Sequence, residues 1–228
     1  MEAWAGHNRE EGGMAVSRRM LSNIAYQAIK ERIATMPSGS YLSARQFALD
    51  LDISYTPVRE AFLRLQKEGV LRQVPNVGFF IQTVDLTDLF QMFQVRECVE
   101  LFALEKVFSK LGESHITRMR SICAEEEKTR QAGDSYRYAE LDSAFHRVPL
   151  EVLGNQPLLG LYDNTRARYQ IISGRLLPLI DEEIQQEHLR LVTAVEQQDL
   201  VQAKDLLLHH IQEMKQRLIN HYVHDHLE

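Results

Sequence analysis

Apolar residues in the first third of the chain recur at helical spacing. Those between Ile24 and Ile33 predict a helix of about 15 residues, which ends at the turn-forming residues 36–40. Ser43 can cap a second, short helix, and Ser54 can cap a third. Three closely spaced helices are therefore expected before residue 70.

The pattern then changes from helical spacing to strands. Gly69 can end the third helix, and residues 70–74 and 79–84 are rich in apolar and β-branched side chains. Residues 75–78 separate these runs with turn-forming Pro, Asn and Gly. Three helices followed by a hairpin predict a winged helix-turn-helix over residues 15–84.

From Leu86 onward the pattern is helical, and no strand is expected. The two-residue link Gln198-Asp199 predicts an antiparallel pair for the last two helices. We therefore predict a mainly α protein, with an N-terminal winged helix-turn-helix and a C-terminal all-α bundle of about six helices. The six amphipathic segments run approximately over 86–110, 114–131, 135–150, 156–173, 181–198 and 200–220.

The overall composition excludes some classes of protein, but the overall charge does not show that the two parts of the chain differ in charge. The 228 residues are 44% apolar and carry a formal charge of −6, which argues against a chain that coats nucleic acid with its whole surface. Residues 15–84, however, hold nine Lys/Arg and five acids, a net +4, whereas residues 85–228 hold 16 and 24, a net −8. No apolar run approaches the roughly 18 residues of a transmembrane helix. Two cysteines and no secretory leader favour a reducing cytoplasm.

Four residues of the acidic part form a candidate metal site. Asp142 and His146 lie four residues apart, on one face of a helix, and His188 and His210 lie within apolar stripes of two further helices. Each histidine alone is more often a satisfied core residue. Buried together, they would leave several polar nitrogens without partners, and a divalent metal ion would satisfy them directly.

Residues 42–71 resemble the N-terminal domain of the GntR family of bacterial transcription regulators. The core Thr-Pro-Val-Arg-Glu-Ala at 56–61, followed by Leu-x-x-Glu-Gly at 65–69, is far more specific than a generic helix-turn-helix pattern. In such a domain the N-terminal part of the third helix enters the major groove of DNA. The resemblance implies a regulator that reads double-stranded DNA.

The DNA contacts can be assigned residue by residue. Arg59 is the best candidate to read a base, because arginine donates two hydrogen bonds to guanine. The resemblance implies that Arg45 also reaches DNA. Ser54 and Thr56 suit phosphate contacts beside a helix N-terminus.

Two further positions, Gly78 and Tyr55, bear on the predicted DNA contacts. Gly78 matches the glycine at the tip of the family's wing, where a backbone can approach the minor groove. Tyr55 stands where the family usually has a second arginine, so one positive charge and one bidentate donor are missing. The family's operator preference is therefore less transferable than its fold.

The C-terminal part resembles the FCD ligand-binding domain of the FadR subfamily. The resemblance rests on Arg96 and Glu100, the Asp142-x-x-x-His146 motif, Asn155, Glu187-His188 and His210. It implies that Asp142, His146, His188 and His210 bind a divalent ion, which in metal-containing members of the subfamily is often zinc or nickel. Nitrogen and oxygen ligands also suit manganese and iron.

An anionic effector would need cations beside the metal. The resemblance implies that Arg96 clamps a small carboxylate, although a surface salt bridge with Glu100 is an equally good interpretation. Arg166 and Tyr169 are further effector-binding candidates. Cys98 and Cys123 fall at bundle positions and are interpreted as small buried hydrophobic residues.

We therefore expect a cytoplasmic homodimer that binds a palindromic operator, most often as a repressor, and that responds to a small organic acid. The alternatives are a metal-sensing regulator and a metal-dependent enzyme. Of these, the enzyme is not the expected function. The predicted organisation is a flexible tail at 1–14, a DNA-binding domain at 15–84, an effector-binding and dimerisation domain at 85–222 and a tail at 223–228.

Overall fold

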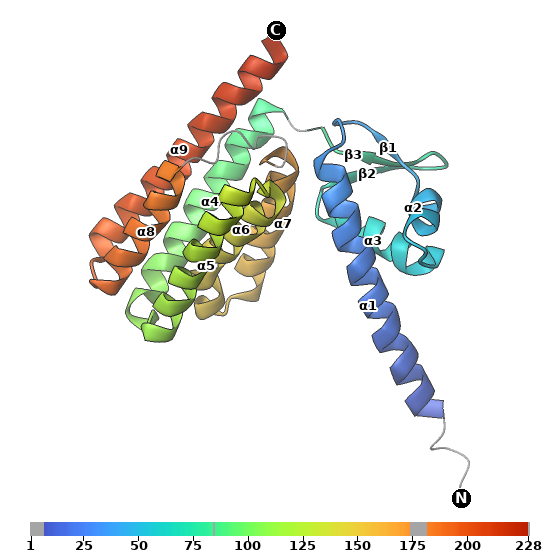
Figure 1. The fold of residues 1–228 in the computed structure, drawn as a ribbon, viewed down its shortest axis with the longest axis horizontal. Helices are drawn as coiled ribbons and strands as arrows, with labels where there is room; N and C mark the ends of the chain where they lie inside the picture. Colours follow the sequence, from blue (N-terminus) through green and yellow to red (C-terminus); the bar gives the residue numbers. More distant parts are fainter. Residues whose placement is uncertain (1–6, 84, 174–181, 228) are drawn as a thin grey trace, which may run out of the picture. The chain divides into compact units, whose positions relative to one another are not determined.

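The computed structural model describes residues 7–83, 85–173 and 182–227. The chain divides into two compact units, Met1–Thr83 and Val84–Glu228 (Figure 1). This division lies one residue from the boundary that the sequence pattern predicts. We describe each unit by itself.

The N-terminal unit has the winged helix-turn-helix arrangement. Its helices pack around Phe62 of the third helix, whose ring contacts Phe47 and Phe79 at centroid distances of 5.4 and 4.9 Å. Ile29 and Ile33 of the first helix are fully buried against the third. The elements are α1 (His7–Ala34), β1 (Tyr41–Leu42), α2 (Ala44–Asp50), α3 (Tyr55–Lys67), β2 (Leu71–Val74) and β3 (Gly78–Ile81).

The sheet has one strand more than the sequence pattern predicts. The hairpin of β2 and β3 is antiparallel, with Leu71 opposite Ile81, and β1 joins the other side of β3 in the order β1-β3-β2. β1 has only two residues, Tyr41 and Leu42, which is too short for a periodic signal. The sequence pattern does not reveal it because its stability comes from pairing with β3.

The C-terminal unit is an all-α bundle. Each of the six predicted segments is a helix, and the bounds differ from the predicted ones by a few residues in most cases. Asn155 caps the fourth of them, since its side chain accepts a hydrogen bond from the Leu158 amide at 3.2 Å. The helices are α4 (Leu86–Val107, followed by the short 3₁₀ helix η1, Phe108–Lys110), α5 (Glu113–Ala132), α6 (Ser135–Leu153), α7 (Gln156–Ser173), α8 (Glu182–Glu196) and α9 (Leu200–Leu227).

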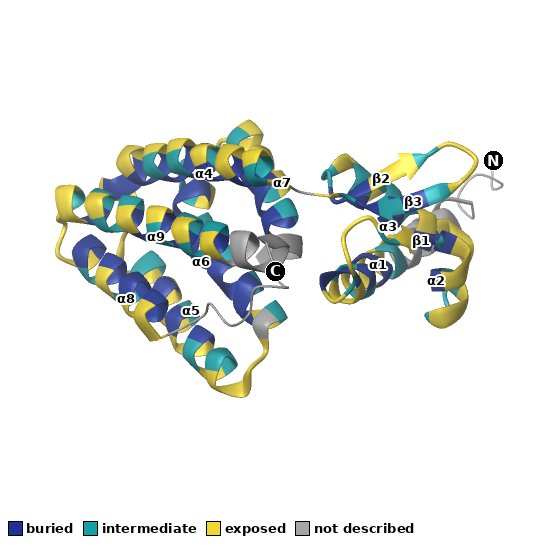
Figure 2. Cartoon of the chain, turned by 90° about the horizontal axis from the view of Figure 1, so that it is seen from above, coloured by how far each residue is buried: buried dark blue, intermediate teal, exposed yellow. Residues whose placement is uncertain are grey.

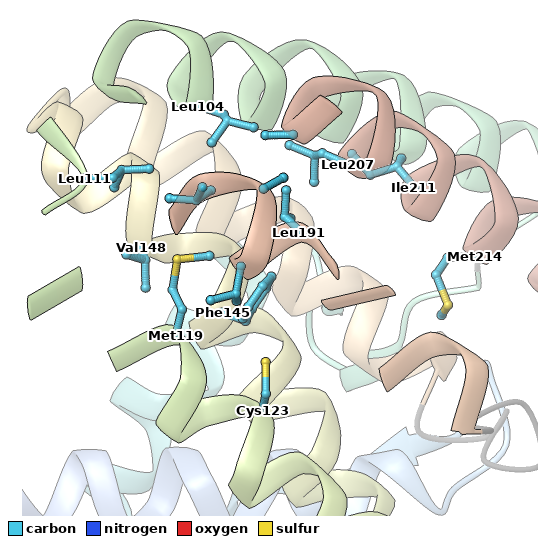
Figure 3. Close-up of a cluster of buried hydrophobic side chains, with 14 of the residues drawn as sticks. Leu104, Leu111, Met119, Cys123, Phe145, Val148, Leu191, Leu207, Ile211 and Met214 are labelled. Atoms are coloured by element: carbon cyan, nitrogen blue, oxygen red, sulfur yellow. The ribbon is translucent and has the colours of Figure 1, made fainter. Parts of the chain in front are cut away.

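A large apolar core holds the bundle together. Phe145 of α6, Leu191 of α8 and Leu207 of α9 lie at its centre, and Met119 of α5 closes it on one side (Figure 3). Buried and exposed positions alternate along the helices at the period of an amphipathic helix (Figure 2). None of the helices that the structure describes is long and apolar enough to cross a bilayer.

Three features differ from the sequence-based expectations. α1 begins at His7 and α9 continues to Leu227, so helix replaces most of both predicted tails. The Gly12-Gly13 pair costs only about 1 kcal/mol per residue within a helix, and no Gly or Pro ends α9. Cys98 is exposed and not buried, whereas Cys123 is buried as expected.

Candidate functional site

Four side chains from three helices converge inside the bundle. Asp142 and His146 come from α6, His188 from α8 and His210 from α9, and all four are buried. The Nε2 atoms of the three histidines lie 3.1–3.4 Å from one another. Asp142 Oδ1 lies 3.5 Å from His188 Nε2 and 3.7 Å from His146 Nε2. The structure thus brings together the whole predicted ligand set.

A second layer of carboxylates fixes the orientation of the imidazoles. His188 Nδ1 lies 2.9 Å from an oxygen of Glu126. His146 Nδ1 lies 2.9 Å from Glu100 Oε2, and His210 Nδ1 lies 2.8 Å from Glu187 Oε2. If His188 donates from Nδ1 to Glu126 and His210 donates from Nδ1 to Glu187, the lone pairs of their Nε2 atoms face the cluster, and Nδ1 of His146 faces Glu100 in the same way.

This arrangement fits a metal ion and is unfavourable without a cation. A tetrahedral ion with metal–nitrogen bonds of about 2.0–2.1 Å would hold its nitrogens about 3.3 Å apart, close to the spacing of the Nε2 atoms. The buried groups near the site include four carboxylates and two guanidinium groups, so a divalent cation would balance their charges when the imidazoles are neutral. Phe145 stacks on the His188 ring at 4.2 Å and holds it in place.

The pKa values follow from burial and from these neighbours. Burial lowers the pKa of His210 well below its usual value, and His188 and His146 lower it further. Burial would raise the pKa of Asp142, but the guanidinium of Arg166 and the two nearest histidines outweigh it and hold it far below the usual range. These directions favour an ionised Asp142 and a neutral His210. At His188, burial would lower the pKa, but the carboxylate of Glu126 outweighs burial and raises it.

Most of the predicted DNA-contacting residues on α3 and at the residue before it are exposed. Tyr55, Thr56 and Arg59 lie on the first turns of α3, and all three are exposed. Ser54 occupies the N-cap position but makes no capping hydrogen bond, so its hydroxyl stays available to a phosphate. Arg45, at the start of α2, lines a surface hollow together with Ser54 and Tyr55.

Arg45 and Arg59 also differ from Arg32, Arg64 and Arg72 of this unit. Among the described residues neither has a hydrogen-bond, ion-pair or ring partner, whereas Arg64 pairs with Glu68 at 3.1 Å and Arg72 lies over the Phe80 ring. Arginines without intramolecular partners are free to donate to bases or phosphates.

The structure gives a steric reason for glycine at position 78. Its φ is +146°, and a Cβ at this position would lie 2.6 Å from the Tyr41 ring. The close approach of β1 therefore requires glycine here, whatever the backbone then contacts.

Two family models match the two units. Residues 21–81 match the bacterial regulatory proteins of the gntR family, and residues 91–213 match the FCD domain. The chain belongs to the GntR family of regulators. It is a DNA-binding transcriptional regulator with an FCD domain, as the resemblance implied.

Relatives and solved structures agree with this assignment. The chain is 26% identical over 192 residues to the uncharacterized HTH-type transcriptional regulator YdhC of Bacillus subtilis, covering 81% of this chain and 85% of that one. It is 21% identical to the HTH-type transcriptional repressor RspR of Escherichia coli and 24% identical to a probable D-xylose utilization operon transcriptional repressor of Paenarthrobacter nicotinovorans, covering 78% and 86% of this chain and 79% and 90% of those relatives.

Among solved structures, E. coli McbR/YncC aligns with a TM-score of 0.78 at 20% identity, over 89% of this chain and 98% of its own. A putative GntR regulator from Rhodococcus sp. RHA1 aligns with a TM-score of 0.76 at 16% identity, over 90% and 98%. These likenesses support the fold.

Buried donors without partners among the described residues lie beside the candidate metal ligands of this GntR-family protein. Arg96 pairs with Glu100 through Nε at 2.8 Å, as the salt-bridge interpretation expected, but inside the bundle and not on its surface. Its Nη1 and Nη2 atoms have no partner among the described residues, and neither does Nη1 of Arg166. Arg166 also donates to Asp142, and its guanidinium lies 4.5 Å from the centre of the Tyr169 ring.

Two residues near the site escaped the sequence-based prediction. Glu126 is fully buried on α5, and Tyr138 lies on α6, one turn before Asp142, with a buried hydroxyl that has no partner among the residues described. Burial, Glu126 and Asp142 raise the pKa of Tyr138, so the hydroxyl remains a donor. A glutamate on the buried stripe of Met119 and Cys123 was the signal that could have indicated Glu126.

Proposed function

We propose that this GntR-family protein is a homodimeric repressor whose operator binding is modulated by a small carboxylate. The effector is held at a divalent metal ion in the C-terminal bundle. The convergence of three imidazole Nε2 atoms, each with its Nδ1 held by a carboxylate, carries the proposal. Two of the relatives are named repressors. The proposal places the protein in the cytoplasm.

Asp142, His146, His188 and His210 would hold the metal. Zinc and nickel suit this set of nitrogen and oxygen ligands best, and manganese and iron also accept it. When bound, the ion would supply a Lewis acid, and a carboxylate of the effector would raise its coordination number above the four protein ligands. Glu100, Glu126 and Glu187 keep the imidazoles in the tautomer that presents Nε2 to the ion.

The chain's own donors would orient the effector. The free Nη atoms of Arg96 and Arg166 are buried, and buried donors without partners are costly until a ligand supplies an acceptor. A carboxylate matches a guanidinium with two parallel hydrogen bonds. Tyr169 stacks beside both guanidinium groups at 4.5 and 5.4 Å and shields them from water.

DNA reading would require two copies of the chain. A helix-turn-helix dimer places two recognition helices on the half-sites of a palindrome. To act as a switch, the effector must bind the DNA-competent and the free state with different affinity, typically by about 1–3 kcal/mol.

One series of measurements tests the proposal. The metal content of the purified protein is measured first, and binding to the DNA upstream of its own gene is then titrated with metal, with a chelator and with candidate acids. We expect about one ion per chain. We also expect that an effector acid changes the affinity for DNA, and that the chelator abolishes this change.

Other outcomes would favour the alternatives. DNA binding that follows the metal alone indicates a metal-sensing regulator, and chemical conversion of an acid, monitored by NMR, indicates a metal-dependent enzyme. Protein that binds no divalent ion at micromolar concentration would refute the metal site.

A further inference from the structure

A surface hollow with largely apolar walls lies beside the arginines that are predicted to contact DNA. It is formed by α2, the turn that follows it and the first residue of α3. Leu49 of α2 is 76% exposed and Tyr55 of α3 is 45% exposed, and both line the hollow together with Arg45. These two side chains call for a partner other than phosphate, because phosphate contacts are made by basic and polar groups.

The turn between α2 and α3 gives the hollow a defined shape. Asp52 has a φ of +52°, and its amide donates to the Leu49 carbonyl at 3.3 Å. The amide of Ile53 donates to the Ala48 carbonyl at 3.1 Å. These two hydrogen bonds form a Schellman motif, which ends α2 and brings the side chains of Ile53 and Ala48 to the same hollow. Leu49 and Tyr55 are therefore positioned by a hydrogen-bonded turn and not by a loose loop.

Tyr55 is directed at the same partner as Arg59. Among the described residues neither the ring nor the hydroxyl of Tyr55 has a partner. Arg59 lies four residues later, so the two side chains stand on one face of α3 with Cβ atoms about 5–6 Å apart. Neighbouring base pairs of DNA are about 3.4 Å apart. When Arg59 contacts a base, Tyr55 would therefore face a base pair one or two steps away.

The chemistry of the hollow selects one feature of the major groove. All four bases present hydrogen-bonding groups there, but only thymine also presents an apolar group, its C5-methyl. Leu49 donates no hydrogen bond to a base or a phosphate. A phosphate also fits poorly, because Asp52 lines the hollow and its carboxylate would repel the phosphate charge.

We infer that the Tyr55 ring and Leu49 read the C5-methyl group of a thymine, one or two base pairs from the base that Arg59 contacts. The inference rests on the DNA-reading part of the proposed function and deepens it, since it names a base of the operator and the group by which it is recognised. An apolar contact at position 55 thus takes the place of the bidentate hydrogen bonds of an arginine.

The test starts from DNA that the wild-type full-length protein selects from a library of random duplexes. Each thymidine of the preferred duplex is then replaced, one at a time, by deoxyuridine, which keeps the hydrogen-bonding groups of thymine and lacks only its methyl group. Fluorescence anisotropy measures the affinity for each duplex. Thymidines at other positions of the same duplex are the internal controls.

We expect one thymine in each half-site whose replacement weakens binding, by about fourfold per half-site, the factor expected for the burial of one methyl group. In Tyr55→Ala and in Leu49→Ala the affinity should fall, and this replacement should no longer matter, because the contact is already lost. Tyr55→Phe keeps the ring and should keep the sensitivity to the methyl group.

The matched control is Ile24→Ala, because Ile24 is an apolar side chain of α1 that is 46% exposed and does not line the hollow. It should bind both duplexes as the wild type does. Circular dichroism checks that every variant is folded.

Three results would overturn the inference. In the first, no thymine of the selected duplex is sensitive to replacement. In the second, the sensitivity persists in both alanine variants. In the third, Tyr55→Phe behaves like Tyr55→Ala, which would assign the contact to the hydroxyl. A protein that selects no common sequence would refute sequence-specific DNA reading itself, and the inference with it, so the two failures are distinguishable.

Discussion

The two units of this regulator use charged residues in opposite ways. In the N-terminal unit, Arg45 and Arg59 are exposed and have no partner among the described residues. In the bundle, Arg96 and Arg166 are buried and paired with carboxylates, while their remaining nitrogens lack partners in the described part of the chain. DNA phosphates and bases approach a protein surface from solvent, so arginines that contact them must be exposed. A small ligand is enclosed inside the protein, so the arginines that contact it are buried.

This difference predicts how each site tolerates change. An exposed arginine without contacts adds nothing to the fold, so its loss should affect binding alone. A buried charge is stable only with its partners, so the loss of one partner should affect folding and binding together. Mutations in the two units can therefore separate the two kinds of site.

The largest effect is expected for His188→Ala. It removes a proposed metal ligand and leaves Glu126 buried without its hydrogen-bond donor, which should cost about 3–5 kcal/mol of unfolding free energy. Metal content should fall to background. Denaturant unfolding and elemental analysis measure both quantities.

The matched control is His209→Ala, because His209 is adjacent to the proposed ligand His210 but its side chain is 57% exposed. It should keep the metal and the stability of the wild type. A His188→Ala protein that binds metal with wild-type affinity would show that the ligand set is incorrect.

Arg59→Ala should abolish specific operator binding. The loss of one bidentate contact costs about 1–3 kcal/mol at each half-site, and a dimer loses two. The unfolding free energy should stay within about 0.5 kcal/mol of the wild type, because the side chain is exposed. Fluorescence anisotropy with operator and scrambled DNA separates specific from non-specific binding. Unchanged operator affinity would remove Arg59 from the set of DNA-reading residues.

Tyr138→Phe tests the buried donors beside the proposed metal site. The hydroxyl has no partner among the described residues, so its removal should leave stability equal or slightly higher. If the hydroxyl donates to the effector, the acid should bind about 5- to 10-fold more weakly, as expected for the loss of one hydrogen bond. Calorimetric titration of metal-loaded protein measures this affinity. Tyr162→Phe is the control, because that hydroxyl already donates to the Ser143 carbonyl at 2.8 Å.

The smallest effect is expected for Tyr55→Arg. Tyr55 is 45% exposed at the start of α3, so an arginine fits there without disturbing the core. It should strengthen DNA binding or alter the operator preference. The slope of log affinity against log salt should steepen by about 1 if the arginine contacts a phosphate. A slope and a preference identical to those of the wild type would place position 55 outside the DNA interface.

Much of the fold could be predicted because it depends on local patterns. The period of apolar residues located all six bundle helices, and the turn at 75–78 located the wing. Extended helix at the chain ends and the two-residue β1 could not be predicted in this way. Weakly patterned ends carry no periodic signal, and a short strand depends on pairing with distant residues.

The exposure of Cys98 shows a similar limit. Its position on an amphipathic helix was compatible with burial, but α4 has neighbours on its other sides and leaves this side open. Which flank of a helix is covered depends on how the helices are arranged, and the sequence period alone does not contain that information.

The sequence by itself determined the family, and it predicted a two-part organisation and a candidate metal site at Asp142, His146, His188 and His210, because specific motifs and helical period depend on local order. Only the tertiary structure decided that the three Nε2 atoms meet within 3.4 Å, and that Glu100, Glu126 and Glu187 each hold one imidazole. These contacts join helices far apart in the chain, and packing alone sets such distances.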